Sequence, residues 1–74
     1  MYERMLRKAS TIRRFTITYL QDAGWDVREE QDSCVLRRVV YHDWHRVERA
    51  SLTFSLEVQS LLKSGWVEAD TSSS

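Results

Sequence analysis

The chain has a single cysteine, Cys34, and this scarcity excludes two common kinds of small domain. One thiol cannot form an intramolecular disulfide, and it cannot supply the several cysteines of a zinc knuckle. A domain of 74 residues without such supports must rely on one small core, so its three tryptophans become important. A lone cysteine also fits a reducing compartment.

Long apolar runs are missing as well. No stretch of about 20 apolar residues could span a membrane, and the N-terminus lacks the apolar run of a signal peptide. We therefore expect a cytosolic, cytoplasmic protein without a membrane partner. The formal net charge is zero, from eleven basic and eleven acidic side chains, so no overall field steers the chain onto nucleic acid.

The charges are nevertheless unevenly distributed along the sequence. Residues 1–14 carry five basic side chains against one acid, and residues 15–36 carry five acids against one base. This asymmetry suits ion pairing between neighbouring segments as well as a basic arm that contacts phosphates.

Alternation of apolar and polar residues predicts three strands within residues 12–41. In "RRFTITYL" the residues Phe15, Ile17 and Tyr19 share one face, and in "WDVREE" the residues Trp25 and Val27 point inward. "QDAG" and "QDS" are turn sequences, and "CVLRRVVY" is the third strand. Because both connections are short, the strands should form an antiparallel meander.

The third strand does not alternate cleanly, since both of its faces are partly apolar. Val35, Val39 and Tyr41 lie on one face with Arg37, and Cys34, Leu36 and Val40 lie on the other face with Arg38. Either a bulge shifts the register midway, or the second face is covered by the N-terminal segment or by another subunit.

Helical periodicity begins after Tyr41 and predicts one helix over about residues 43–64. An arc of about 120° collects its apolar and small residues: Trp44, Val47, Ala50, Ser51, Phe54, Val58, Leu61 and Leu62. Asp43 is the expected N-cap. Gly65 should end the helix in a left-handed conformation, with Trp66 folding back on Leu61.

The N-terminal segment, residues 1–11, is predicted to be an arm or a short helix. Tyr2, Met5, Leu6 and Ala9 form a stripe at helical spacing, although two turns are marginal without something to dock on. The expected fold class is therefore α+β: a three-stranded antiparallel meander packed against one long C-terminal helix. We expect residues 1–68 to form one domain and residues 69–74 to form a disordered tail.

The stretch "YHDWHRVERA" raises the question of a reactive centre. His42, Asp43 and His45 could bind a metal together with Cys34, and the same cysteine beside either histidine could be a thiol nucleophile. However, His42 precedes the helix cap, so the two rings need not converge, and no oxyanion hole is visible. We interpret the stretch as the corner between strand and helix, and expect no metal, no cofactor and no enzyme activity.

Basic residues at the N-terminus define a candidate nucleic-acid site. Its members are Arg4, Arg7, Lys8, Arg13 and Arg14. A solvated basic face beside an acidic second strand explains them equally well. The outer face of the sheet is also mixed in sign, which is unusual for a surface that follows a phosphate backbone.

Leu52 and Leu56 lie on the polar side of the helix, opposite Phe54 and Val58. Two leucines at a spacing of four form a ridge, which we predict to be covered. The cover could be the N-terminal stripe of the same or a neighbouring chain, or a homodimer contact, with simple exposure as the remaining alternative. The candidate interface consists of Leu52, Leu56, His45, Gln59, Leu36 and Val40.

The order of three strands and a helix over about residues 13–66 resembles two families. "KSGW" is similar to the helix end of the WGR domain, although "WDVREE" stands in place of the Trp-Gly-Arg triplet. The crossing "VVYHDWHRVERASLTF" resembles the third strand and helix of the GCC-box DNA-binding domain, without its arginine- and tryptophan-rich DNA face. Both resemblances imply the topology alone. The function we predict is a small non-catalytic binding or assembly module that self-associates as a homodimer through the outer face of the helix or the sheet, or binds another protein. Nucleic-acid binding through the basic N-terminal segment and the sheet is the alternative.

Overall fold

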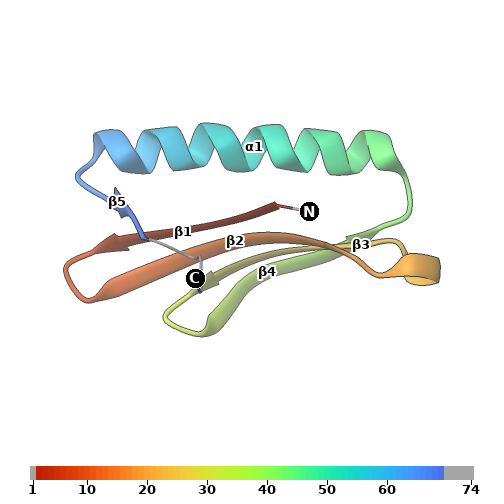
Figure 1. The fold of residues 1–74 in the computed structure, drawn as a ribbon, viewed down its shortest axis with the longest axis horizontal. Helices are drawn as coiled ribbons and strands as arrows, with labels where there is room; N and C mark the ends of the chain where they lie inside the picture. The colour runs from red at the N-terminus through yellow and green to blue at the C-terminus, as the bar shows by residue number, and fades with distance from the viewer. Residues whose placement is uncertain (1, 70–74) are drawn as a thin grey trace.

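Five antiparallel strands form one sheet, and a single long helix covers one of its faces (Figure 1). The computed structural model describes residues 2–69. The elements are β1 (Tyr2–Lys8), β2 (Thr11–Tyr19), the short 3-10 helix η1 (Gln21–Ala23), β3 (Trp25–Gln31), β4 (Cys34–Tyr41), α1 (Trp44–Lys63) and β5 (Val67–Glu68). The strand order across the sheet is β4-β3-β2-β1-β5. The α+β class and the long helix are confirmed, whereas three strands were too few.

The N-terminal segment is a strand, so the prediction of a short helix or arm was wrong. β1 pairs with β2 along its whole length, from Tyr2 opposite Ile17 to Lys8 opposite Thr11. The apolar residues of this segment fit the two-residue period of a strand as well as the period of a helix. Pairing with a neighbouring strand stabilises the segment far more than two helical turns could. Leu6 consequently becomes fully buried, while Met5 points to the opposite face.

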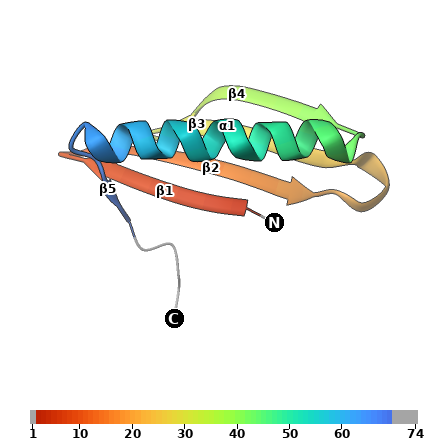
Figure 2. The same ribbon diagram turned by 90° about the horizontal axis from the view of Figure 1, so that it is seen from above.

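β5 adds a fifth strand that the sequence did not suggest. It pairs with Leu6 and Arg7 at the outer edge of β1, and the Ala69 N–H donates a hydrogen bond to the Met5 carbonyl at 2.7 Å. Residue 69 therefore belongs to the fold, and the rest of the predicted tail, residues 70–74, lies outside the described residues. The helix leaves β4 at one edge of the sheet and delivers β5 to the other (Figure 2).

The irregular third strand of the prediction is explained by a bulge. Glu29 pairs with Arg37, but the next residue, Glu30, pairs with Val35, so Leu36 is the extra residue of β4. The bulge places Val39 toward the helix and moves Val35 to the opposite face. Of the two alternatives for this strand, the bulge is thus confirmed.

The limits of the helix follow the capping residues closely. Asp43, in an extended conformation, accepts a hydrogen bond from the His45 N–H at 3.0 Å. At the other end Gly65 has a φ of +98°, and the Trp66 N–H donates to the Leu61 carbonyl at 3.1 Å. These are the features of a Schellman closure, as the sequence predicted.

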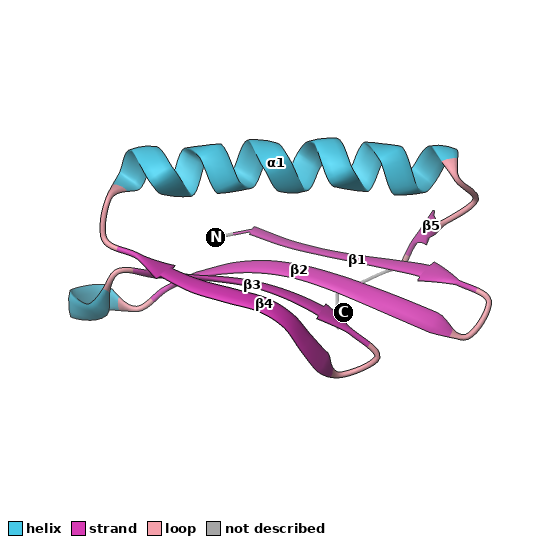
Figure 3. Ribbon diagram, turned by 180° about the vertical axis from the view of Figure 1, so that it is seen from behind, coloured by secondary structure: helices cyan, strands magenta, loops and turns pink. Residues whose placement is uncertain are grey.

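The core lies between α1 and the sheet. Its buried members are Leu6, Phe15, Ile17, Val27, Val47, Phe54 and Val58. The opposite face of the sheet carries no helix within residues 2–69 (Figure 3). The domain therefore offers two large surfaces to a partner: the outer side of α1 and the open face of the sheet.

Candidate functional site

The stretch "HDWH" is a corner between β4 and α1. Asp43 caps the helix, and the His45 side chain is 89% exposed, with Nδ1 3.8 Å from the nearest Glu48 oxygen. His42 is exposed, and Cys34 stands at the far end of β4. Among residues 2–69, no group of three or more histidine, cysteine, aspartate or glutamate side chains is arranged to hold a metal ion.

The five basic residues of the candidate nucleic-acid site do not share one surface. Arg4 forms an ion pair with Glu68, and Lys8 donates to the Ser64 carbonyl at 2.9 Å. Arg13 lies partly buried beneath the helix, paired with two carboxylates. Of these five, Arg7 and Arg14 are exposed and have neither an ion pair nor a hydrogen bond to a carbonyl among residues 2–69. The grouping fails because alternation along β1 and β2 sends neighbouring residues to opposite faces.

The open face of the sheet joins arginines with a buried carboxylate. Asp26 is buried, although it belongs to this face, because Arg28 and Arg38 donate to its two oxygens at 2.8 and 3.0 Å. Arg14 approaches only the sulfur of Met5, at 3.9 Å. The face is mixed in charge, as the sequence indicated.

A second ionic cluster lies between the helix and the sheet. Arg13 of β2 donates to Glu29 of β3 and, at 3.0 Å, to Glu57 of α1. Partial burial and the neighbouring Glu29 carboxylate raise the pKa of Glu57 above its ordinary value, and Arg13 offsets this only in part. At the edge of the sheet the reverse holds, because the hydrogen bond from Arg4 lowers the pKa of Glu68.

Leu52 and Leu56 project from the outer side of α1, with exposures of 66% and 67%. The N-terminal segment cannot cover them, because β1 lies in the sheet on the opposite side of the helix (Figure 1). Of the alternatives for the cover, the N-terminal stripe of the same chain is therefore excluded. Two leucines one helical turn apart remain as an apolar ridge without a partner among the described residues.

The remaining predicted interface residues fall into two separate groups. His45 and Gln59 are exposed on α1 beside the leucine ridge. Leu36 and Val40 belong to β4, an edge strand, and both are exposed there. The two groups lie on different elements on opposite layers of the fold, so they cannot form one continuous patch.

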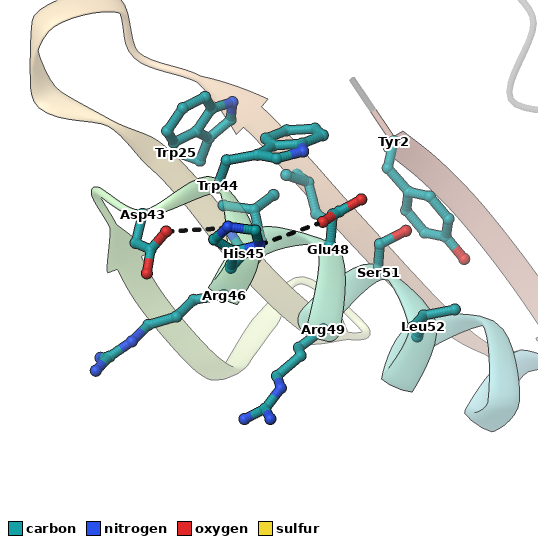
Figure 4. A pocket seen from close by; sticks show the side chains of 12 residues that line it. Tyr2, Trp25, Asp43, Trp44, His45, Arg46, Glu48, Arg49, Ser51 and Leu52 are labelled. Carbon is teal, nitrogen blue, oxygen red and sulfur yellow. Dashed lines mark hydrogen bonds and ion pairs between the residues drawn. The ribbon is translucent and has the colours of Figure 1, made fainter.

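An aromatic groove, which the sequence did not predict, flanks the first half of the helix (Figure 4). Trp25 and Trp44 pack at a tilt of 55° with ring centroids 5.5 Å apart, and Tyr2 stands across the groove. Tyr19, outside the groove, packs against Trp25 with ring centroids 5.3 Å apart. Trp44 is 53% exposed, because it packs on Trp25 at the end of the helix instead of entering the core. The groove has a volume of about 900 Å³, and Leu52 lies on its border.

Three arginines that the sequence did not single out share another groove, on the β4 side of α1. Arg46 and Arg49 also line the aromatic groove, but their side chains extend away from Tyr2 and Trp44 (Figure 4). With Arg37 of β4 they surround a groove of about 330 Å³. The available signal was the i,i+3 spacing of the two helical arginines, which places them on one flank.

No protein-family model, curated protein or solved structure matches this chain. The resemblance to the WGR and GCC-box domains stays a prediction, since it rests on the order of β2, β3, β4 and α1 alone. No helix within residues 2–69 combines the length and apolar character needed to cross a membrane.

Proposed function

We propose that the chain is a small, non-catalytic assembly module of the cytosol that self-associates through the outer side of α1. The observation that carries this proposal is the ridge of Leu52 and Leu56, whose exposures are the two highest among the exposed large hydrophobic side chains. Burying a leucine side chain contributes about 1.5 to 3 kcal/mol, so covering the ridge in each of two copies favours association. The single thiol, Cys34, is free and exposed, which suits a reducing compartment.

The surface around the ridge can accept a copy of itself. Leu52 stands on the border of the aromatic groove, where Tyr2 and Trp44 offer apolar walls. Ser51 and Ser55 occupy the same flank of the helix, and small side chains let two helices approach closely. A leucine of one copy then enters the aromatic groove of the other copy. In a dimer with a two-fold axis each copy makes this contact, so it occurs twice.

The Glu48 and Lys63 side chains and the helix dipoles favour an antiparallel arrangement of the two helices. Side by side in parallel, each Glu48 would face the partner's Glu48, and each Lys63 the partner's Lys63. Antiparallel packing brings the Glu48 end of one helix toward the Lys63 end of the other. It also aligns the two helix dipoles favourably.

Nucleic-acid binding is the rival function, and the arrangement of charges supports it less. Arg4, Lys8 and Arg13 are engaged within the domain, and the open face that retains Arg14 also holds acidic side chains. An oligonucleotide added at about 50 mM salt should therefore leave the sedimentation of the protein unchanged.

Sedimentation velocity over a range of protein concentrations tests self-association. The wild-type chain should sediment as a dimer at high concentration, and Leu52→Glu with Leu56→Glu should give a folded monomer, because charge is not tolerated in a desolvated contact. Leu36→Glu on β4 is the control, since it adds a negative charge at an exposed leucine away from the helix. A wild-type protein that stays monomeric, or a dimer that only Leu36→Glu dissociates, would contradict the proposal.

A further inference from the structure

The groove between α1 and β4 is surrounded by three arginines from two elements. Arg46 and Arg49 lie on the helix, and Arg37 follows the bulge of β4. Within residues 2–69, no carboxylate lies within 4.0 Å of any of the three guanidinium groups. Three like charges are therefore gathered around one small groove, and none of them forms a direct ion pair.

The absence of ion pairs here is not a general property of this domain. Glu29 and Glu57 are engaged by Arg13, Asp26 by Arg28 and Arg38, and Glu68 by Arg4. Asp32 and Asp43 accept hydrogen bonds from backbone N–H groups. These six acidic side chains thus have partners other than Arg37, Arg46 and Arg49, although the chain as a whole is neutral.

The groove combines its basic rim with an apolar floor. Val27 and Val39 of the sheet and Phe54 of the helix line it, and Tyr41 and Thr53 add two hydroxyl groups. Glu29 also lines the groove, but Arg13 donates to its carboxylate from the neighbouring strand. The volume of about 330 Å³ is at the lower end of the range for small-ligand pockets.

Guanidinium groups match the geometry of a phosphate, because their planar fork presents parallel N–H donors to two oxygens. Several arginines converging from different elements are also the arrangement that recognises phosphorylated groups. An apolar floor beside such a rim selects a phosphate carried on an apolar or aromatic body over the free ion. We propose that this groove binds an organic phosphate monoester, with the phosphate held by Arg37, Arg46 and Arg49 and the organic group resting on Val27, Val39 and Phe54.

Titration of the whole chain with phenyl phosphate, followed by backbone amide chemical shifts, tests this inference. Shifts should concentrate on β4 around Arg37 and on the first turns of α1. Inorganic phosphate should bind at least several-fold more weakly, because it lacks the aromatic body, and phenol should not bind measurably, because it lacks the charge. Raising the salt concentration should weaken the binding of phenyl phosphate.

Variants locate the site and separate it from the dimer contact. Arg46→Gln and Arg37→Gln should each weaken binding of phenyl phosphate by about tenfold, as expected for loss of one charge-assisted contact. Arg14→Gln on the open face is the matched control and should change nothing. The same titration is run on the double variant Leu52→Glu with Leu56→Glu. Because this variant lacks the proposed dimer contact but keeps the three arginines, the test of phosphate binding does not depend on self-association.

Three results would overturn the inference. The first is the absence of any amide chemical-shift change when phenyl phosphate is present at about millimolar concentration and in about 10-fold excess over the protein, since even weak ligands bind at such concentrations. The second is equal binding by phenol, which would make the groove merely apolar. The third is binding of a short single-stranded oligonucleotide with no binding of phenyl phosphate, which would assign the arginines to a phosphodiester backbone.

Discussion

The carboxylate of Glu57 lies 3.0 Å from the guanidinium of Arg13, which ties the middle of the helix to β2 across the core layer. Arg13 also serves Glu29, so one positive charge stands between two carboxylates in a partly desolvated space. Arg37, the cross-strand neighbour of Glu29, is a further charged residue on this side of the sheet. The pKa of Glu57 is therefore higher in the fold than for a carboxyl group in water.

Glu57→Gln should change the pH dependence of stability. The folded protein has the higher pKa at this residue, so the fold binds more protons than the unfolded chain, and its contribution to stability falls as pH rises above the ordinary value of 4.5. Glutamine keeps an acceptor for Arg13 without the charge. Urea unfolding between pH 4 and pH 8 should show a smaller loss of stability with rising pH in the variant than in the wild type.

The control for this experiment is Glu3→Gln, which removes an exposed acid on the opposite face of the sheet. It should reproduce the wild-type profile. If Glu57→Gln and Glu3→Gln give the same profile, the two carboxylates beneath the helix do not repel each other as described.

Glu68→Gln should have the opposite sign. The hydrogen bond from Arg4 lowers the pKa of Glu68 in the fold, so its contribution is present above the ordinary value of 4.5 and is lost as pH falls through the lowered pKa. The pair is about a third to a half exposed, so the loss at pH 7 should be under about 1 kcal/mol. The measurement is urea unfolding at low and high salt, and a wild-type advantage that survives high salt would argue against an ionic origin.

The two glycines should differ in their tolerance of alanine. Both have positive φ, +95° at Gly24 and +98° at Gly65, but a Cβ at Gly24 would overlap the Tyr41 carbonyl, whereas one at Gly65 would meet only the flexible end of Lys8. Gly65→Ala should destabilise by about 1 kcal/mol. Gly24→Ala should cost at least about 2 kcal/mol, because its ψ of −142° places it where almost only glycine is found.

Thermal unfolding of the two variants checks this order. Gly65→Asn serves as a control, because asparagine tolerates the left-handed conformation and should recover part of the loss. Equal effects of alanine at the two positions would mean that the corner at Tyr41 can move aside.

Local signals predicted the parts of this fold whose causes are local. Asp43 and Gly65 define the helix because capping depends on a few neighbouring residues, and both ends agree with the structure. β1 was misread because Tyr2, Met5 and Leu6 fit a short helix as well as a strand, and only pairing with β2 decides between them. The pairing of β5 with β1 joins the two ends of the described chain, and no local pattern announces it.

The candidate sites show the same division. Leu52 and Leu56 could be placed on the outer side of the helix from periodicity alone. Alternation along β2 is enough to place Arg13 and Arg14 on opposite faces of the sheet. The partners of Arg13, however, come from β3 and α1, and the sequence does not specify how these elements align with β2. The groove at Arg37 and Arg46 likewise depends on the bulge in β4 and on where the helix crosses the sheet.

Leu6→Ala should be among the most damaging single changes, because β1 is an internal strand and not an arm. Leu6 is fully buried against the helix, so the substitution removes apolar contacts and leaves a cavity, which costs about 2 to 5 kcal/mol. Leu36→Ala is the matched control, since the same atoms are removed from an exposed bulge position, and it should stay within about 0.5 kcal/mol of the wild type. Urea unfolding of both variants measures the difference. Similar urea midpoints for Leu6→Ala and Leu36→Ala would mean that residues 2–8 are only loosely attached to the domain, as an N-terminal arm would be.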